Sequence, residues 1–219
     1  MTLTAEPWAL TREAVRDARR QGLDEEQIEA AVGVISMFNY FTRVADATGI
    51  EFDYVTPLPA FEPDLGQVTA PRPDRPGSSW PHSGRRLGHP GLQAAWESWR
   101  AYVLDAEEPI SRRERRILAS VAAEEAADWE GAGALNGLES LADGDERLVG
   151  FARKLSRQPW RMEEGDLAGL RAAGYSEEAV LHVISVVAHQ NADSRLAAGL
   201  GAAGLGAAVP VRSGPRRPG

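Results

Sequence analysis

A cluster of carboxylates and a pair of histidines are the groups in this sequence whose types and spacing suit chemistry. Glu124 and Asp128 are one helical turn apart, and Glu130 follows directly. His182 and His189 lie two turns apart on one face of a later helix. A carboxyl group whose pKa is raised by an apolar pocket can act with a histidine as a general acid and base. We therefore take Glu130, Glu124 and His189 as candidate catalytic residues.

Asp128, Trp129 and His182 accompany these residues and are the candidate binding residues. The same carboxylates and histidines also form a donor set of the kind that binds a metal ion. We nevertheless expect neither a metal nor an organic cofactor. A purely structural interpretation stays open for both groups. The carboxylates suit a solvated helix end, and His189 suits the core of an apolar helix.

The composition excludes several classes of function. The chain has 219 residues, no cysteine and a formal net charge of −8. Disulfides, thiol nucleophiles and thiolate metal ligands are therefore excluded, and the negative charge argues against nucleic acid as a partner. No apolar run reaches the ~18–20 residues of a membrane span, and the first residues do not resemble a signal peptide. We expect a cytoplasmic protein that binds neither nucleic acid nor membrane.

One stretch of the sequence occurs twice, and this restricts the fold that positions these groups. Residues 7–50 and 159–202 align without a gap at an offset of 152. Helix-forming residues dominate and strand-like alternation is nearly absent, so the predicted class is all-α. An ungapped repeat of this length indicates that one helical unit is built twice.

Each copy is predicted to be a helical hairpin. Pro-Trp opens a first helix, at 11–20 and 163–172, and a long second helix follows at 25–48 and 177–199. The second helix of the first copy is apolar on nearly every side, as in a helix that is buried among others. We expect the two long helices to pack near a local two-fold axis.

The ends of these helices carry capping residues. Gly22 and Gly174 follow the first helices, where a residue in the left-handed conformation is needed. Asp24 and Ser176 are the expected N-caps of the second helices.

Two polar pairs recur inside the long helices. Asn39 and Arg43 share a helix face, and Asn191 and Arg195 repeat the pair. Buried polar groups must find partners. We expect the pairs to tie neighbouring helices or a helix end together; contact with a ligand is the alternative.

The copies divide the chain unequally. Further helices precede the second copy, whereas a proline-rich stretch follows the first. These helices are expected at 91–104, at 112–127 behind a Ser111–Glu114 capping box, at 131–143, and from an N-cap at Asp145 onward. We predict a half unit at 1–50, a Pro-rich linker at 51–88, a full unit at 89–202 and a disordered tail at 203–219.

Several segments carry a family resemblance. In the full unit they are SRRERRILASVAA at 111–123, DERLVGFARKLSRQPW at 145–160 and AGYSEEAVLHVISVVAHQNADSRLAAGLG at 173–201. The first copy adds GLDEEQIEAAVGVISMFNYFTRVADATGIE, with the run Phe38-Asn39-x-x-x-Arg43. These segments resemble the carboxymuconolactone decarboxylase / AhpD-like (alkylhydroperoxidase D-like) superfamily. The resemblance implies an AhpD-like helical bundle with a duplicated hairpin, which associates as a homo-oligomer.

The redox centre of that family is missing from this sequence. Peroxidase members carry Cys-x-x-Cys followed by His, with a Glu on the preceding helix. The matching stretch here is ADWEGAGAL at 127–135, which places Ala127 and Glu130 at the cysteine positions and Ala134 at the histidine position. Glu114 is the nearest match to the preceding Glu. The resemblance therefore implies the family fold without the thiol peroxidase reaction.

Two kinds of function remain. The chain is expected to be a small-molecule-binding or structural member of the family, whose half unit replaces a partner subunit. The alternative is a cofactor-independent acid/base enzyme of the lyase, isomerase or decarboxylase type, because decarboxylase members need no thiol. It would use Glu130 or Glu124 with His189.

Overall fold

The computed structural model describes residues 2–50, 72, 87–137, 141–142 and 144–206. Within these ranges the chain is all-α, as predicted, with nine α-helices, two short 3-10 helices and no strand. The 3-10 helices span Pro7–Ala9 and Pro159–Arg161. The α-helices are α1 (Thr2–Ala5), α2 (Arg12–Arg20), α3 (Glu25–Thr48), α4 (Pro90–Asp105), α5 (Arg112–Glu125), α6 (Trp129–Leu135), α7 (Glu146–Arg157), α8 (Glu164–Ala172) and α9 (Glu177–Ala203).

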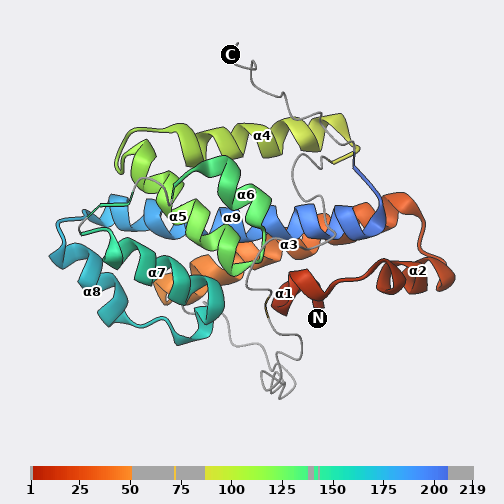
Figure 1. Ribbon diagram of the computed structural model, residues 1–219, viewed down its shortest axis with the longest axis horizontal. Coiled ribbons are helices and arrows are strands. Elements are labelled where there is room, and N and C mark those ends of the chain that lie inside the picture. Colours follow the sequence, from red (N-terminus) through yellow and green to blue (C-terminus); the bar gives the residue numbers. More distant parts are fainter. Residues whose placement is uncertain (1, 51–71, 73–86, 138–140, 143, 207–219) are drawn as a thin grey trace, which may run out of the picture.

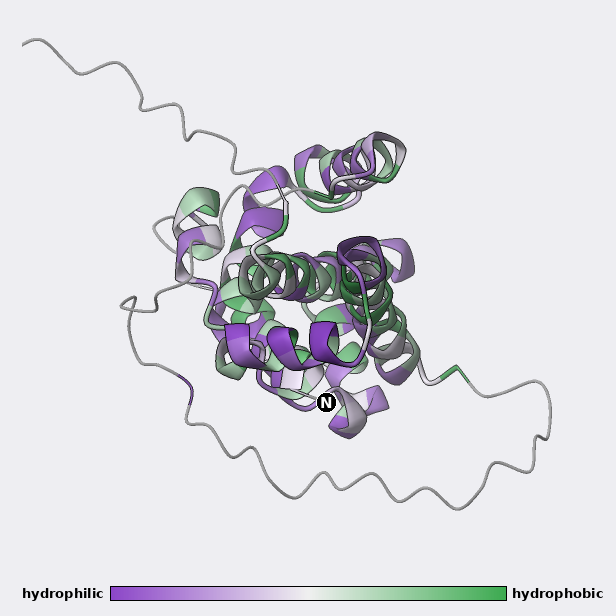
Figure 2. Cartoon of the chain, turned by 90° about the vertical axis from the view of Figure 1, so that its right-hand side faces the viewer, coloured by the Kyte–Doolittle hydropathy of each residue, from purple (hydrophilic) through white to green (hydrophobic). Residues whose placement is uncertain are grey.

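Helices α3 and α9 form the centre of the molecule. They lie side by side along its long axis, run in opposite directions and make the most extensive contact between described elements (Figure 1). Helix α5 packs on α9, and α6 and α7 pack on α5. Hydrophobic residues gather on the central helices, while the outer helices carry more of the hydrophilic residues (Figure 2).

The predicted helix ends of the repeat are confirmed. The side chains of Asp24 and Ser176 each accept a hydrogen bond from the backbone N–H three residues on, so both are N-caps. Gly22 and Gly174 have φ values of 98° and 97°. A side chain would be strained at these angles, which explains glycine at both positions.

Two predicted helices of the full unit end differently. Helix α5 ends at Glu125, because Ala127 turns the chain into the left-handed region with φ 57°. The helix predicted at 131–143 is α6, which begins at Trp129 and ends before Asn136. Asn136 has φ 53° and stops the helix in the manner usual for glycine.

The predicted capping role of Asp145 is wrong. Its side chain makes no capping hydrogen bond to α7. The carboxylate is instead bound by the guanidinium of Arg113 and by the backbone N–H of Ala142. Helix α9 also differs from its prediction, since it continues to Ala203 and ends at Gly204.

The structural repeat begins earlier than Pro7. Helix α1 and the 3-10 helix after it correspond, at the same offset of 152, to the last turn of α7 and the 3-10 helix that follows. Leu3 and its counterpart Leu155 are both buried. The structural repeat therefore includes the last turn of α7, which α1 matches in the first copy.

Buried arginines join the two copies in a reciprocal pattern. Nη2 of Arg43 donates to the carbonyl of Ser156, 3.1 Å away. Nη2 of Arg195 donates to the carbonyl of Thr4, 2.9 Å away. Thr4 and Ser156 are equivalent residues of the repeat. Each copy thus caps the end of a helix in the other, as two subunits do across a two-fold interface.

The asparagine of each polar pair orients its arginine. Nη1 of Arg43 donates to the side-chain oxygen of Asn39 at 3.0 Å, and Nη1 of Arg195 donates to that of Asn191 at 2.9 Å. The amide of Asn191 also donates to the hydroxyl of Ser156, 2.8 Å away. The predicted helix-tying role of both pairs is confirmed.

The local two-fold arrangement brings α3 and α9 very close. A Cβ atom placed on Gly199 would lie 2.4 Å from Cγ1 and 3.2 Å from Cβ of Val32. Both copies share their hydrophobic clusters: Val15 and Ile28 pack with Ala202 and Ala203. Residues 51–71 and 73–86 of the predicted linker, and 207–219 of the predicted tail, lie outside the described residues.

Replacing Arg195 with Met tests this interface. We expect the free energy of unfolding to fall by about 3 kcal/mol, because the change strands buried carbonyl groups of both copies. Arg171→Met is the matched control, since Arg171 forms its ion pairs with Glu164 and Glu177 at the surface. Urea unfolding of both variants measures the difference. Equal effects of the two substitutions would contradict the cross-copy role of Arg195.

Candidate functional site

Asp128, in the segment between α5 and α6, is hydrogen-bonded to residues of α6 and α9. Asp128 is the N-cap of α6, and its Oδ1 accepts from the backbone N–H of Gly131 at 2.9 Å. Its Oδ2 accepts from the hydroxyl of Ser194 at 2.7 Å, and that hydroxyl accepts from Nε2 of Gln190 at 3.2 Å. Burial raises the pKa of Asp128, although these hydrogen bonds oppose the shift. Asp128 therefore joins α6 to α9.

Trp129 and Glu130, the first two residues of α6, differ in exposure. Glu130 lies in the first turn of α6 and is exposed. Trp129 is half-buried, and its indole Nε1 is buried without a hydrogen-bond partner. The guanidinium carbon of Arg72 lies 5.8 Å from the centre of the Trp129 ring, which is within the range of a cation–π contact.

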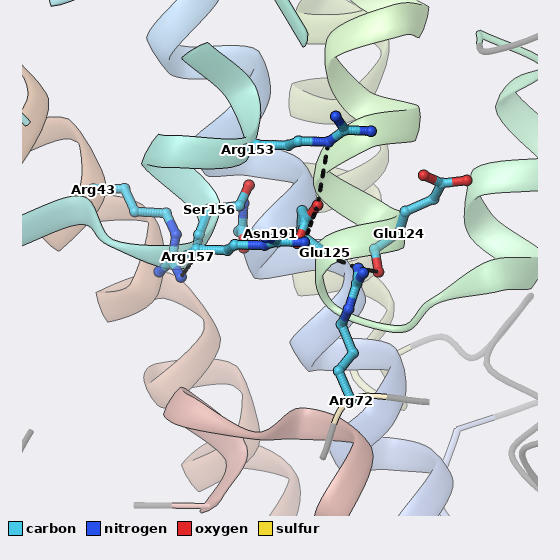
Figure 3. A network of polar contacts seen from close by, with 8 residues as sticks. All are labelled: Arg43, Arg72, Glu124, Glu125, Arg153, Ser156, Arg157 and Asn191. Atoms are coloured by element: carbon cyan, nitrogen blue, oxygen red, sulfur yellow. Dashed lines mark hydrogen bonds and ion pairs between the residues drawn. The ribbon is translucent and has the colours of Figure 1, made fainter. Parts of the chain in front are cut away.

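Glu124 and its neighbour Glu125 point in different directions at the end of α5 (Figure 3). Glu124 is half-buried, and burial raises the pKa of its carboxyl group, opposed by the charge of Arg153. Glu125 is buried, and it attracts three arginines. Nη1 of Arg72 lies 3.2 Å from its carboxylate, Nε of Arg153 lies 3.6 Å away, and Arg157 bonds to both oxygens.

His189 is enclosed by tryptophans on the other side of α9. Its side chain is fully buried, and the ring centroid lies 4.5 Å from that of Trp99 and 5.9 Å from that of Trp96. Neither ring nitrogen has a hydrogen-bond partner. Burial lowers the pKa of His189 to about 4, so the imidazole is neutral at pH 7.

His182 bonds to a buried arginine. Nη2 of Arg115 lies 3.1 Å from Nδ1 of His182, and because a guanidinium only donates, the ring nitrogen accepts. Arg115 also donates to the carbonyls of Val103, Glu108 and Ile110. Burial and the charge of Arg115 lower the pKa of His182.

Glu114, the match to the family's preceding glutamate, is engaged at the start of α5. Its carboxylate accepts from the backbone N–H and hydroxyl of Ser111, as predicted, and from the hydroxyl of Tyr175 at 2.6 Å. Burial acts to raise the pKa of Glu114, but these hydrogen bonds outweigh it and hold the pKa below its usual value.

The structure separates the predicted catalytic residues. Gln190 and Ser194 face Asp128, whereas His189, about 100° around α9 from Gln190, faces the tryptophans of α4. His189 is sealed from solvent, while Glu130 is exposed. Proton transfer requires a general acid and a base that both reach the substrate. This arrangement does not provide such a pair.

Neither of two surface hollows nor any group of potential metal ligands in the described residues offers another candidate site. One hollow lies between α7 and α8 beside Asp166, and another lies beside Tyr175. Neither is lined by Glu124, Glu130 or His189. In the part of the chain that the structure describes, no three His, Asp or Glu side chains gather in a group that could hold a metal ion.

Sequence reasoning missed the residues that carry the strongest buried polar contacts. Nothing in the sequence distinguishes Glu125 from the neighbouring Glu124, and Arg72 lies in the proline-rich stretch. Arg115 is one of four arginines within residues 112–116, and the sequence does not distinguish it from the others. One signal for buried polar contacts was available in the sequence, namely that nearly every cationic residue is Arg. An Arg side chain can bind several carbonyl or carboxylate oxygens at once.

Comparisons leave the chain without a matching relative. No family model, curated protein or solved structure matches it. Among the described helices, none combines the length and apolar character needed to cross a membrane. The described residues are all-α, and the family resemblance remains an expectation from the sequence.

The buried imidazole predicts a specific loss of stability in acid. His189 has a pKa of about 4 in the folded chain and about 6.5 when unfolded, so between these values only the unfolded chain takes up the proton. Stability is retained above pH 6.5 and is lost as the pH falls toward 4. From pH 7 to pH 5 we expect this group to cost about 2 kcal/mol.

His189→Met removes the titrating group and introduces the residue at the equivalent position of α3, Met37. Urea unfolding of the wild type and the variant at pH 7 and pH 5 measures the difference. We expect the variant to lose less stability than the wild type over this interval. Parallel losses in both proteins would show that His189 is not held neutral in the core.

Proposed function

We propose that this protein is a thiol-free relative of the carboxymuconolactone decarboxylase / AhpD-like proteins that acts as a structural or small-molecule-binding protein. In this proposal the half unit takes the place of a partner subunit. The AhpD-like architecture is supported by the sequence segments given above and by the duplicated hairpin. A cytoplasmic location and assembly into a homo-oligomer belong to the same proposal.

The observation that carries the proposal is the occupied segment between α5 and α6. The resemblance puts the family's dithiol and histidine at residues 127–134. Here Ala127 is a turn residue, Asp128 caps a helix and bonds Ser194, and Glu130 is an exposed residue on the surface of α6. Asp128 joins α6 to α9, and none of the three residues is a redox group.

Small-molecule binding has its own support. Buried polar atoms without a partner are costly and call for an explanation. Three such side chains lie on α6 and α9: Trp129 at Nε1, Gln190 at Oε1 and His189 at both nitrogens. A small hydrogen-bonding molecule or ordered water would satisfy Trp129 or Gln190, whereas His189 lies on another face of α9 and is sealed from solvent.

The alternative is a cofactor-independent acid/base enzyme of the lyase, isomerase or decarboxylase type. One observation favours it. Burial raises the pKa of Glu124, which brings this half-buried carboxyl group closer to the range in which it can donate and accept a proton. The enclosed His189 does not complete a pair with it, so we place this function second.

Turnover assays separate the two functions. We expect the purified protein to leave hydrogen peroxide, an organic hydroperoxide and a small lactone acid unconverted above the rate without protein. We also expect Glu124→Gln and Glu130→Gln to change neither this result nor the melting temperature. Turnover that Glu124→Gln or Glu130→Gln abolishes in a folded variant would establish the enzyme and overturn the proposal.

A further inference from the structure

One face of α3 is apolar and exposed along the middle of the helix. Val34, Phe38 and Phe41 have exposed fractions of 56 %, 63 % and 55 %. Ala31, Ile35 and Thr42 are also exposed and complete what we name the α3 stripe. Large hydrophobic side chains rarely gather on the free surface of a monomer, and where they do they mark an interaction site.

The internal repeat shows what this face lacks. The equivalents of Ala31, Val34, Ile35, Phe38 and Thr42 on α9 are Val183, Val186, Val187, Gln190 and Ser194. All five of these α9 residues are buried, with exposed fractions of at most 2 %. Helix α5 covers this part of α9, and Asp128 at the start of α6 bonds to Ser194.

Within the described residues, α1 and the 3-10 helix at Pro7–Ala9 stand before the hairpin of the first copy, and neither corresponds to α4, α5 or α6. Five of the six stripe positions are therefore exposed in one copy and buried in the other, while Asp193, the equivalent of Phe41, is half-buried. The apolar character of the stripe is explained if another helix covers it.

We propose that the α3 stripe is the contact between two copies of this chain, which meet stripe to stripe about a two-fold axis. Of the eleven large hydrophobic residues exposed on the described surface, six lie on α3 or next to its ends, at Leu23, Val34, Ile35, Phe38, Phe41 and Ile50. The apolar surface of a second copy that can pair with the α3 stripe is therefore the α3 stripe of that copy. Such a contact is isologous, the usual form of a homodimer interface.

The size of the stripe fits a reversible dimer. A phenylalanine side chain buries roughly 150–250 Å² in full, so the exposed parts of Phe38 and Phe41 contribute about 200 Å² per chain. Stable interfaces bury about 800 Å² per partner. The stripe is smaller than this, and we expect a dimer that dissociates on dilution. This contact is independent of whether the protein is catalytic.

Substitution of Phe38 tests the contact. Sedimentation of the wild-type chain over a series of concentrations should show a monomer–dimer equilibrium. Phe38→Glu should raise the dissociation constant at least about 30-fold, because the charge would be buried at the centre of the contact. Leu181→Glu is the matched control, since Leu181 is exposed to 52 % on α9, away from the stripe, and it should leave the equilibrium unchanged. Circular dichroism checks that both variants are folded.

Cross-linking gives a second measurement, which identifies the residues that lie at the contact in the associated form. The chain has no cysteine, so Val34→Cys and Phe38→Cys each introduce a single thiol. A short bis-maleimide should join two chains of at least one of these variants, and should not join those of Leu181→Cys.

Three results would overturn the proposal. The first is a chain that stays monomeric at every concentration. This includes a monomer in which another segment of the same chain protects the α3 stripe from hydrogen exchange. The second is a dimer that Phe38→Glu leaves intact. The third is cross-linking through Leu181→Cys but not through the stripe.

Discussion

The reciprocal hydrogen bonds of Arg43 and Arg195 are the interaction on which the rest of this structure depends. Each guanidinium is buried in one copy of the repeat and donates to a carbonyl of the other. Burial lowers the pKa of Arg43 to about 10, so the group keeps its charge at neutral pH. A buried charge is tolerated only with good partners. The two copies must therefore stay together, and α3 and α9 are fixed against each other.

This internal pairing makes the two copies unequal. The second copy has α4 to α7 in front of its hairpin, and α9 is buried along most of its length. In the described part of the first copy, a match to the last turn of α7 precedes the hairpin, and α3 is covered by α9 on one face and exposed on another. The same duplication thus explains both the buried centre of the molecule and its exposed apolar stripe. Asp128, a candidate binding residue, belongs to this framework together with Glu125 and Arg115, since each of the three joins one helix or loop to another.

The sequence predicted the fold better than the site. Caps and periodicity are local, so the repeat, the N-caps at Asp24 and Ser176 and the bounds of α3 follow from neighbouring residues. The pairing of Arg43 with Ser156 joins residues far apart in the chain and is visible only once the helices are packed. Asp145 was mistaken for a cap because a carboxylate before a helix looks the same whether it binds the helix or a distant Arg113. The surroundings of His189 likewise depend on where α4 packs against α9.

The internal two-fold pairing of α3 and α9 is tested most directly by a disulfide between them. A Cβ atom on Gly199 would lie 3.2 Å from Cβ of Val32, near the ~3.5–4.5 Å separation of disulfide-bonded residues. The natural chain has no cysteine, so Val32→Cys with Gly199→Cys introduces the only two thiols. We expect mild oxidation to link them within a single chain, which mass spectrometry of the digested monomer identifies. Free thiols after oxidation, or links formed only between chains, would contradict the pairing of the two copies.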